Sequence, residues 1–290
     1  MDCGDLSRLS LGELHAVDTV FLSHGHIDHW IGFDQLLRAQ LFQGHELRVL
    51  GPAGLHAMLE GKLRGYTWNL VADSQLVIAG YEWNSQNWLR CDYPCARRFQ
   101  SAGPPIPAEP PELEGWKLSW VELQHGVACL GFRLQAPRQF RFRIEQARAQ
   151  GLAPGPWVEQ LKRSRALGHR QLKLRLDERE LSAESLWDLL EELQPCSLAY
   201  ITDTRLGPDT RGRIVERFGP TQQLWCEPAF LEHQRQLAED KLHATAREAA
   251  QLALELPAQE LHLFHLSRRT QGDADDHLRE ARSLFSHVYC

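Results

Sequence analysis

The segment from residue 23 to residue 29, SHGHIDH, limits what this chain can fold into more than any other. The apolar run before it, residues 17–22, predicts a buried strand. A helix would spread adjacent metal-binding side chains around its circumference, and a flat strand would alternate them between two faces. We therefore expect a tight loop that aims all of them inward. Its four side chains suited to zinc or a similar ion are His24, His26, Asp28 and His29.

Later strands also end at side chains that can bind a metal or transfer a proton. These side chains are His125, Asp203, Glu227 and His265. In layered α/β folds, the loops that follow strands gather at one edge of the sheets. Seven groups then suit two ions, with zinc favoured and manganese or iron left open. We predict that one ion is held by His24, His26 and His125, the other by Asp28, His29 and His265, and that Asp203 bridges both.

Strand and helix patterns alternate along most of the chain, which favours a layered α/β architecture. Short strands are predicted at residues 47–50, 118–123, 129–134, 197–201, 224–227 and 261–264, and helices at 11–15, 31–42, from 53, 182–193 and 245–257. The last helix begins with the capping box Thr-Ala-Arg-Glu. We expect antiparallel strands and a surface loop within residues 66–116.

Composition narrows the class of protein. The 290 residues suit one large domain or two small ones, and we predict a single domain over 1–290. The net charge of −6 argues against a protein that binds polyanions over its whole surface. Seven scattered cysteines, no charged-then-apolar leader and no apolar run long enough for a bilayer predict a cytoplasmic protein with reduced thiols and no membrane partner. Cys91 and Cys95 could form half of a metal site, but no second half follows.

One stretch departs from this acidic background. Residues 138–175 hold ten Arg or Lys and only two acids, with the stiff segment Gly-Leu-Ala-Pro-Gly-Pro at 151–156 in the middle. A charge run is often only a solvated face. A basic arm with a rigid tip inside an acidic protein instead favours contact with a polyanion.

These residues together resemble the ribonuclease Z family of the metallo-β-lactamase fold, over nearly the whole chain. The opening Asp-Cys-Gly-Asp at 2–5, the metal motif and Gly-Pro-Ala-Gly-Leu at 51–55 match family segments. More specific are the Gly-Pro tip, Asp-Thr-Arg at 203–205, and a late series that matches the family's H-E-A-T, H-S-T and H-x-S-x-R motifs. That series comprises Glu227, His243, Thr245, His265, Ser267 and Arg268.

The resemblance implies a four-layer αββα sandwich, here with its N-terminal strands apparently shortened, and an endonuclease that removes the 3′ trailer of precursor tRNA. It further implies that the arm of residues 138–175 clamps the tRNA elbow, and that a homodimer lets one arm serve the partner's active site. In the mechanism that we expect, a hydroxide bridging the two ions attacks phosphorus and Asp28 orients or deprotonates it. His243, supported by Glu227, protonates or polarises the leaving 3′-oxygen.

Four positions depart from the family pattern. Thr202 stands where the family has Gly, Cys226 and Pro228 replace the His and Ala of H-E-A-T, and Ala244 replaces the Ser of H-S-T. None is a predicted metal ligand, so the departures concern substrate positioning. Two alternatives therefore stay open: a hydrolase of a small phosphodiester or thioester with the same fold, and a non-catalytic RNA-binding relative.

Overall fold

A computed structural model describes residues 1–71, 73–176, 179–266 and 274–290. Ser267 and Arg268, predicted above to belong to the last family motif, lie outside the described residues. The chain divides into two compact units. The first unit comprises Met1–Glu112, Leu118–Leu134 and Leu198–Cys290, and the second unit comprises Leu113–Lys117 and Gln135–Ser197.

The N-terminal half of the first unit is built on a five-stranded sheet with the order β1-β2-β3-β4-β5. Its strands are β1 (Thr19–Phe21), β2 (Glu46–Pro52), β3 (Val77–Trp83), β4 (Trp88–Pro94) and β5 (Ile106–Ala108). The first three strands run parallel, and the last two pairings are antiparallel, as predicted for residues 66–116. The associated helices are α1 (Leu11–Ala16), α2 (Ile27–Trp30), α3 (Phe33–Gln40) and α4 (Leu55–Arg64).

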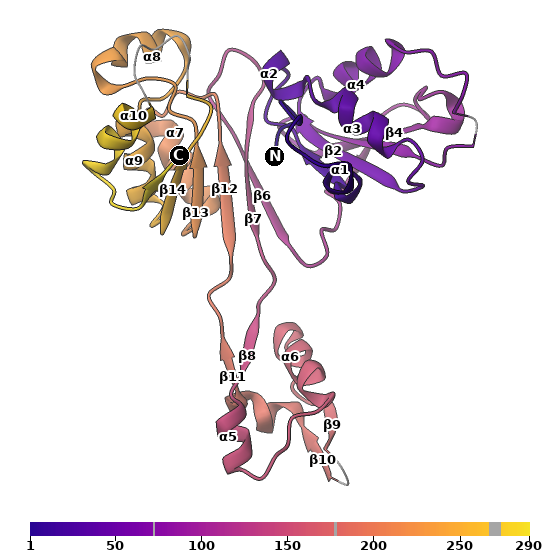
Figure 1. The fold of residues 1–290 in the computed structure, drawn as a ribbon, viewed down its shortest axis with the longest axis vertical. Coiled ribbons are helices and arrows are strands. Elements are labelled where there is room, and N and C mark those ends of the chain that lie inside the picture. Colours follow the sequence, from indigo (N-terminus) through magenta and orange to yellow (C-terminus); the bar gives the residue numbers. More distant parts are fainter. Residues whose placement is uncertain (72, 177–178, 267–273) are drawn as a thin grey trace. The chain divides into compact units, whose positions relative to one another are not determined.

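Helical spacing explains how this sheet is covered (Figure 1). In α4, Leu55, Leu59 and Leu63 recur every four residues, and all three are buried with the apolar side chains of β2 and β3. Residues at that spacing share one face of a helix. The core of this half therefore lies between the sheet and its helices, and the strand ends remain available for polar loops.

The C-terminal half of the first unit is a six-stranded sheet with the order β15-β14-β13-β12-β7-β6. Its strands are β6 (Lys117–Glu122), β7 (Leu130–Gln135), β12 (Ser197–Ile201), β13 (Gln223–Cys226), β14 (Glu260–Leu263) and β15 (Val288–Tyr289). Strands β12 to β15 pair in parallel, so their carboxyl ends meet at one edge. The helices of this half are α7 (Pro208–Phe218), α8 (Arg235–Lys241), α9 (Ala246–Glu255) and α10 (Ala274–Arg282).

The capping box predicted for the helix after residue 245 is confirmed. Thr245 Oγ1 accepts a hydrogen bond from the backbone N–H of Glu248, and the Glu248 carboxylate accepts one from the N–H of Thr245. Such reciprocal bonds satisfy two N–H groups that a helix start leaves unpaired. The start of α9 is therefore fixed, and with it the position of the loop that carries His243.

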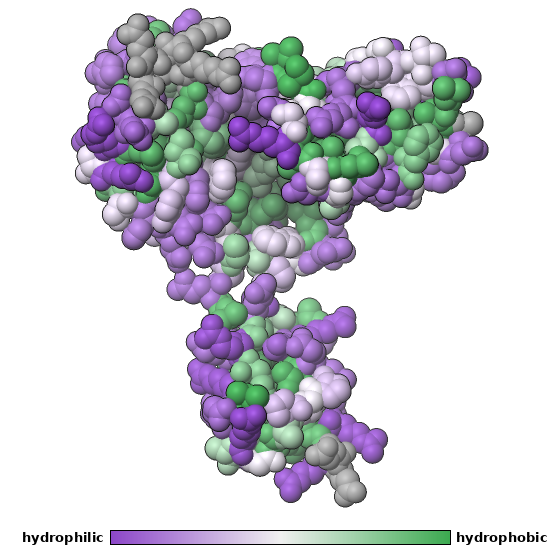
Figure 2. All heavy atoms as spheres, viewed as in Figure 1, coloured by the Kyte–Doolittle hydropathy of each residue, from purple (hydrophilic) through white to green (hydrophobic). Residues whose placement is uncertain are grey.

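The second unit has its own small hydrophobic core, in which Trp157, Leu161 and Leu186 are buried together. Hydrophilic residues cover much of its visible surface (Figure 2). Its elements are β8 (Phe140–Phe142), α5 (Ile144–Ala149), α6 (Trp157–Leu167), β9 (Lys173–Leu176), β10 (Arg179–Ser182), the 3₁₀ helix η2 (Ala183–Leu189) and β11 (Leu190–Glu192).

The α-helix predicted for residues 182–193 is wrong. Residues 183–189 form the 3₁₀ helix η2, and residues 190–192 form a strand paired antiparallel with β8. The reason is the apolar spacing, because the buried side chains of Ala183, Leu186 and Leu189 recur every three residues. A repeat of three lines up along a 3₁₀ helix, and the ladder with β8 then satisfies the following backbone groups.

Among the residues that the structure describes, no helix is both long enough and apolar enough to cross a lipid bilayer. All seven cysteines are unpaired. Those at positions 3, 91, 95, 129 and 226 are buried, and those at 196 and 290 are exposed. The buried thiols therefore behave as small apolar side chains.

Candidate metal centre

The structure brings the predicted metal-binding groups together in two clusters within the first unit. In each cluster one ligand atom per residue lies within 4.8 Å of the others. The first cluster consists of His24, His26, His125 and Asp203, and the second cluster consists of His29, Asp203, Glu227 and His265. Asp203 is common to both. The side chains come from the segments that follow β1, β6, β12, β13 and β14, so residues far apart in sequence converge at one edge of the sheets.

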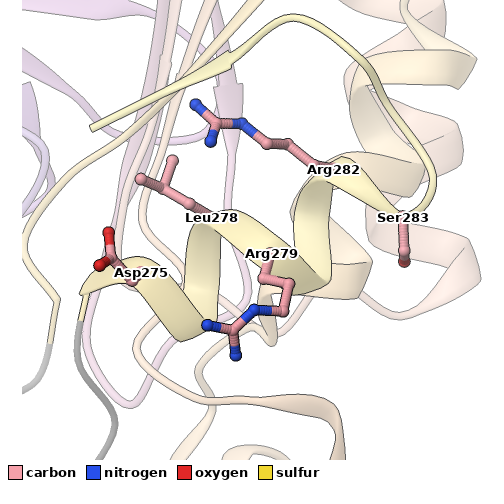
Figure 3. Close-up of a pocket in the computed structure, with 5 residues that line it drawn as sticks. All are labelled: Asp275, Leu278, Arg279, Arg282 and Ser283. Carbon is pink, nitrogen blue, oxygen red and sulfur yellow. The ribbon is translucent and has the colours of Figure 1, made fainter.

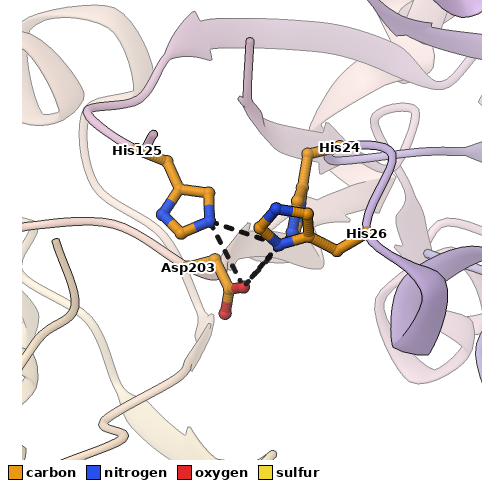
Figure 4. Close-up of side chains that lie close together, drawn as sticks. All are labelled: His24, His26, His125 and Asp203. Carbon is orange, nitrogen blue, oxygen red and sulfur yellow. Dashed lines mark hydrogen bonds and ion pairs between the residues drawn. The ribbon is translucent and has the colours of Figure 1, made fainter. Parts of the chain in front are cut away.

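The first cluster surrounds one oxygen of Asp203 (Figure 4). Asp203 Oδ2 lies 3.2 Å from His24 Nε2, 3.6 Å from His125 Nε2 and 4.0 Å from His26 Nδ1. Zinc–nitrogen bonds of about 2.0–2.1 Å place two ligands of a tetrahedral ion roughly 3.3–3.4 Å apart. The first two spacings fit that value, and His26, whose side chain is 48% exposed, lies slightly further out.

Buried polar atoms in the two clusters support a cation site independently of the spacing. His24 Nε2, His29 Nε2 and Asp203 Oδ1 are buried and make no hydrogen bond to any residue that the structure describes. A buried polar atom without a partner costs free energy, because it has given up its bonds to water. Imidazole nitrogens and a carboxylate that face one another in this way fit a divalent ion bound between them.

The second cluster is arranged around His29 and His265. His29 Nε2 lies 3.6 Å from Asp203 Oδ2. His265 Nδ1 lies 3.1 Å from Glu227 Oε2, while its Nε2 lies 3.3 Å from Asp28 Oδ2. Asp28, a predicted ligand, is not a member of the second cluster, whereas Glu227, predicted to act in catalysis, is. Both carboxylates therefore contact the same imidazole, one on each ring nitrogen.

The local backbone differs from the tight loop that the sequence predicted. His24 and His26 do lie in a loop, but Asp28 and His29 stand on the one-turn helix α2, for which His26 is the N-cap. Asp203 and His265 have φ angles of 31° and 53°, in the left-handed region that residues other than Gly rarely adopt. Strain of this kind is found where surrounding structure holds a functional side chain in a particular direction.

Asp2 supports residues of the metal centre without belonging to either cluster, a role that was not predicted from the sequence. Its carboxylate accepts hydrogen bonds from the backbone N–H (2.6 Å) and hydroxyl (2.8 Å) of Ser23 and from Tyr200 Oη (2.9 Å). It also lies 2.7 Å from His29 Nδ1, so Nε2 of that ring faces Asp203. A carboxylate on the far nitrogen fixes the orientation of a metal-binding imidazole. The partners of Asp2 are up to 198 positions away in sequence, so the spacing of residues along the chain could not predict these contacts.

Glu227 is enclosed by polar partners. Thr202 Oγ1 donates to Glu227 Oε2 at 2.5 Å, and the Asp203 N–H donates to the same oxygen at 3.3 Å. His243 Nδ1 lies 3.6 Å from Glu227 Oε1 and 3.7 Å from Asp203 Oδ1. The structure therefore places His243 next to the centre, although it belongs to neither cluster.

Charge interactions inside the centre shift several pKa values. Contact with Glu227 raises the pKa of His265 to about 9. Burial raises the pKa of Glu227, but its neighbours His243 and His265 outweigh that effect and hold it well below the usual range. Burial lowers the pKa of His125. Glu227 is therefore ionised, which allows it to accept the Nδ1 proton of His265 and to leave Nε2 facing the centre.

Comparisons with known proteins agree with this arrangement. A family model described as a beta-lactamase superfamily domain matches residues 5–86. A ribonuclease Z from Deinococcus radiodurans is 31% identical to the chain over 298 residues, which cover 98% of this chain and 87% of the relative. The solved structure of the metallo-beta-lactamase fold protein YhfI from Bacillus subtilis superposes with a TM-score of 0.55 and 16% identity, over 100% of this chain and 81% of that one.

The structure of human tRNase Z, short form, covers 99% of this chain and 83% of its own, with a TM-score of 0.53 and 15% identity. The two structural likenesses confirm the predicted fold, with its two sheets and two sets of helices. The sequence likeness goes further, because it extends over almost the whole chain. The chain therefore belongs to the ribonuclease Z family, the endoribonucleases of the metallo-β-lactamase superfamily.

Proposed function

We propose that this enzyme hydrolyses a phosphodiester at the 3′ end of precursor tRNA with the help of two zinc ions. One observation carries the proposal. In a chain of the ribonuclease Z family, two clusters of metal-capable side chains share Asp203, so two ions held there would act on the same phosphate. Divalent ions bound at such a site would supply an activated water and neutralise charge that develops on the phosphoryl oxygens.

We further propose that His24, His26, His125 and Asp203 hold one ion and that Asp203, Asp28, His29 and His265 hold the other. Asp28 is preferred over Glu227 as a ligand because of what each carboxylate already contacts. Glu227 is 3% exposed and is occupied by Thr202, the Asp203 N–H and His265 Nδ1. The side chain of Asp28 is 52% exposed and faces His265 Nε2, the nitrogen left over for a metal. Glu227 then orients His265, as carboxylates commonly do for ligating histidines.

His243 is the proposed proton donor to the leaving 3′-oxygen. Burial lowers its pKa, but nearby Glu227 and Asp203 more than compensate, so the pKa of His243 is raised and the ring tends to carry its proton. The side chain of His243 is 23% exposed, so a substrate can reach the ring. The carboxylate of Glu227 lies beside Nδ1 of the same ring. A positioned acid of this type typically contributes a factor of about 10²–10⁴ in rate.

The arm of residues 138–175 is proposed to bind the tRNA elbow, although its positive charge is partly offset. Residues 135–197 contain eleven Lys or Arg and nine Asp or Glu, a net charge of +2. Arg138 pairs with Glu192, and Lys173 with Glu180. Arg143 and Arg163 are exposed and make no ion pair with any residue that the structure describes, so they are the arginines most available to phosphates.

The enzyme is also proposed to work as a homodimer in the cytoplasm. Ile27 and Ile31, on and just after α2, are 74% and 55% exposed, which supports a second copy covering this surface. Sedimentation equilibrium should then give twice the chain mass of 33.2 kDa. A monomer across the micromolar range would contradict the dimer and leave the catalytic proposal unaffected.

The function is tested with a 3′-extended precursor tRNA, with and without chelator, by mapping the cut site. We expect one cut at the end of the acceptor stem, lost with chelator and restored by zinc. A small chromogenic phosphodiester, which has no elbow, reports on the metal centre separately. Cleavage of the small substrate without cleavage of the precursor would favour the small-molecule hydrolase instead.

A further inference from the structure

A cavity of about 260 Å³ in the first unit is lined by four arginines and has no role in the mechanism above. Its walls come from the loop after β12 and from α7, α8 and α9. The lining residues are Arg205, Gly207, Pro208, Arg211, Arg235, Glu239, Arg247, Glu248 and Gln251. A larger hollow of about 480 Å³ along α10 differs from it (Figure 3), because its two arginines are already engaged, Arg279 by Asp276 and Arg282 by the Val288 carbonyl.

Two of the four guanidinium groups in the cavity are committed to the protein. Arg211 Nε lies 3.1 Å from Glu255 Oε2, and its Nη1 donates to the Leu206 carbonyl at 2.6 Å. Arg235 pairs with Glu232 at 2.7 Å and with Glu248 at 3.3 Å. These contacts hold α7, α8 and α9 together, so Arg211 and Arg235 shape the cavity.

The other two guanidinium groups have donors to spare. The ion pair of Arg205 with Glu239 is 3.6 Å long, which exceeds hydrogen-bonding distance. The side chain of Arg247 is exposed and makes no hydrogen bond or ion pair with the described residues. Guanidinium is always charged, and its planar set of N–H donors matches the oxygens of a phosphate. The cavity therefore presents two guanidinium groups, one of them in a long ion pair, whose N–H donors can still bind a phosphate.

Arg205 and Arg247 are both close in sequence to residues in or beside the metal centre. Arg205 follows Asp203 by two residues, and its backbone N–H donates to the carbonyl of Gln124, the neighbour of His125. Arg247 lies in the first turn of α9, four residues after His243. Because His243 serves the leaving 3′-oxygen in the proposed mechanism, the nucleotide that carries this oxygen lies on the His243 side of the centre.

We propose that Arg205 and Arg247 bind the backbone phosphate on the 5′ side of the nucleotide that carries the leaving 3′-oxygen. The inference rests on the proposed function and deepens it, since it assigns the upstream RNA strand to this cavity. A small phosphodiester lacks that phosphate. The two arginines therefore help the enzyme to select a polynucleotide.

The test measures binding to the zinc-loaded enzyme of an acceptor-stem minihelix RNA that ends at the cut position, so that no cleavage interferes. The minihelix is made with a normal phosphate or with a neutral methylphosphonate at the proposed position. The proteins are wild type, Arg205→Gln, Arg247→Gln and, as a matched control, Arg279→Gln, whose arginine pairs with Asp276 outside the cavity. Fluorescence anisotropy gives Kd, and circular dichroism checks folding.

We expect each cavity variant to raise Kd about 10-fold, as the loss of one charge-assisted contact implies. The methylphosphonate, which removes both contacts, should weaken wild-type binding by about 100-fold and each single cavity variant, which keeps one arginine, by only about 10-fold. Arg279→Gln should respond to the methylphosphonate as wild type does. Unchanged Kd in the variants, or a methylphosphonate effect equal in variants and wild type, would overturn the assignment. Wild-type cleavage of a precursor tRNA, assayed in parallel, decides the proposed function on its own.

Discussion

The two clusters of the metal centre share Asp203 but are supported in different ways. Two histidines of the first cluster, His24 and His26, come from the same short loop. Ser23 Oγ lies 3.0 Å from His24 Nδ1 and donates to the Asp2 carboxylate, so that carboxylate reaches His24 Nδ1 only through a hydroxyl group. In the second cluster each histidine has a carboxylate on Nδ1, Asp2 for His29 and Glu227 for His265. Among the described residues, the first cluster therefore has no carboxylate in direct contact with His24 Nδ1, whereas both histidines of the second cluster have one on Nδ1.

Asp203→Asn should have the largest effect, because it removes the one group common to both clusters. An amide loses the negative charge that offsets two cations, so we expect both ions to be lost at micromolar zinc. Turnover of precursor tRNA should fall by roughly 10³-fold or more, since metal activation of water is lost. Metal content by mass spectrometry and kcat are the measurements. Retention of one ion per chain would show that one cluster is complete without Asp203.

His243→Ala should have the next largest effect and should leave the metal content intact. The ring lies beside Glu227 and Asp203 but belongs to neither cluster, so its loss removes a proton donor and no ligand. We expect kcat for precursor tRNA to fall by about 10²-fold. His233→Ala, in the preceding 3₁₀ turn, is a suitable control. Unchanged kcat would remove His243 from the mechanism, and loss of an ion would make it a ligand.

Asp28→Asn and Glu227→Gln together test how the second cluster is divided between ligand and support. We expect Asp28→Asn to lose one of two ions, because its carboxylate faces His265 Nε2. Glu227→Gln should keep both ions at saturating zinc while kcat falls by about 10-fold to 100-fold, through the orientation of His265 and His243. The reverse pattern of metal loss would make Glu227 the ligand and Asp28 the support.

The first cluster was largely predictable from sequence, and the support of the second was not. His24 and His26 stand two positions apart after an apolar run, and His125 and Asp203 each follow a strand. Strand ends meet at one edge of a layered fold, so local pattern was sufficient. Asp2 acts through Ser23, His29 and Tyr200, at separations of 21 to 198 residues. Only the tertiary structure brings such partners together.

The same reasoning explains what the sequence missed in the second unit. A window of residues 138–175 is strongly basic, but the acids that offset it lie just beyond that window. Glu180, Glu184 and Glu192 pair with Lys173, Arg170 and Arg138. A charge count along the chain cannot show which cations are already paired across a hairpin or between neighbouring elements. Exposed, unpaired arginines are the better guide to a phosphate-binding surface.

Asp2→Asn should have the smallest effect and bears most directly on the difference between the clusters. The amide keeps its size, but its nitrogen cannot accept hydrogen bonds, so the contacts with His29, Ser23 and Tyr200 are weakened on one side. Affinity for one of the two zinc ions should fall by about 10-fold to 100-fold, as for other lost supports of ligating histidines. At saturating zinc, kcat should recover to within a few-fold of wild type.

Competition with a chromogenic zinc chelator measures the two affinities separately. Asp5→Asn is the matched control, since Asp5 is exposed on the same loop and its carboxylate accepts the N–H of Ser7. If Asp2 supports the second cluster, its variant weakens one ion and leaves the other unchanged. Equal weakening of both ions would mean that Asp2 acts through Ser23 on His24 as well, and the two clusters would then share one support.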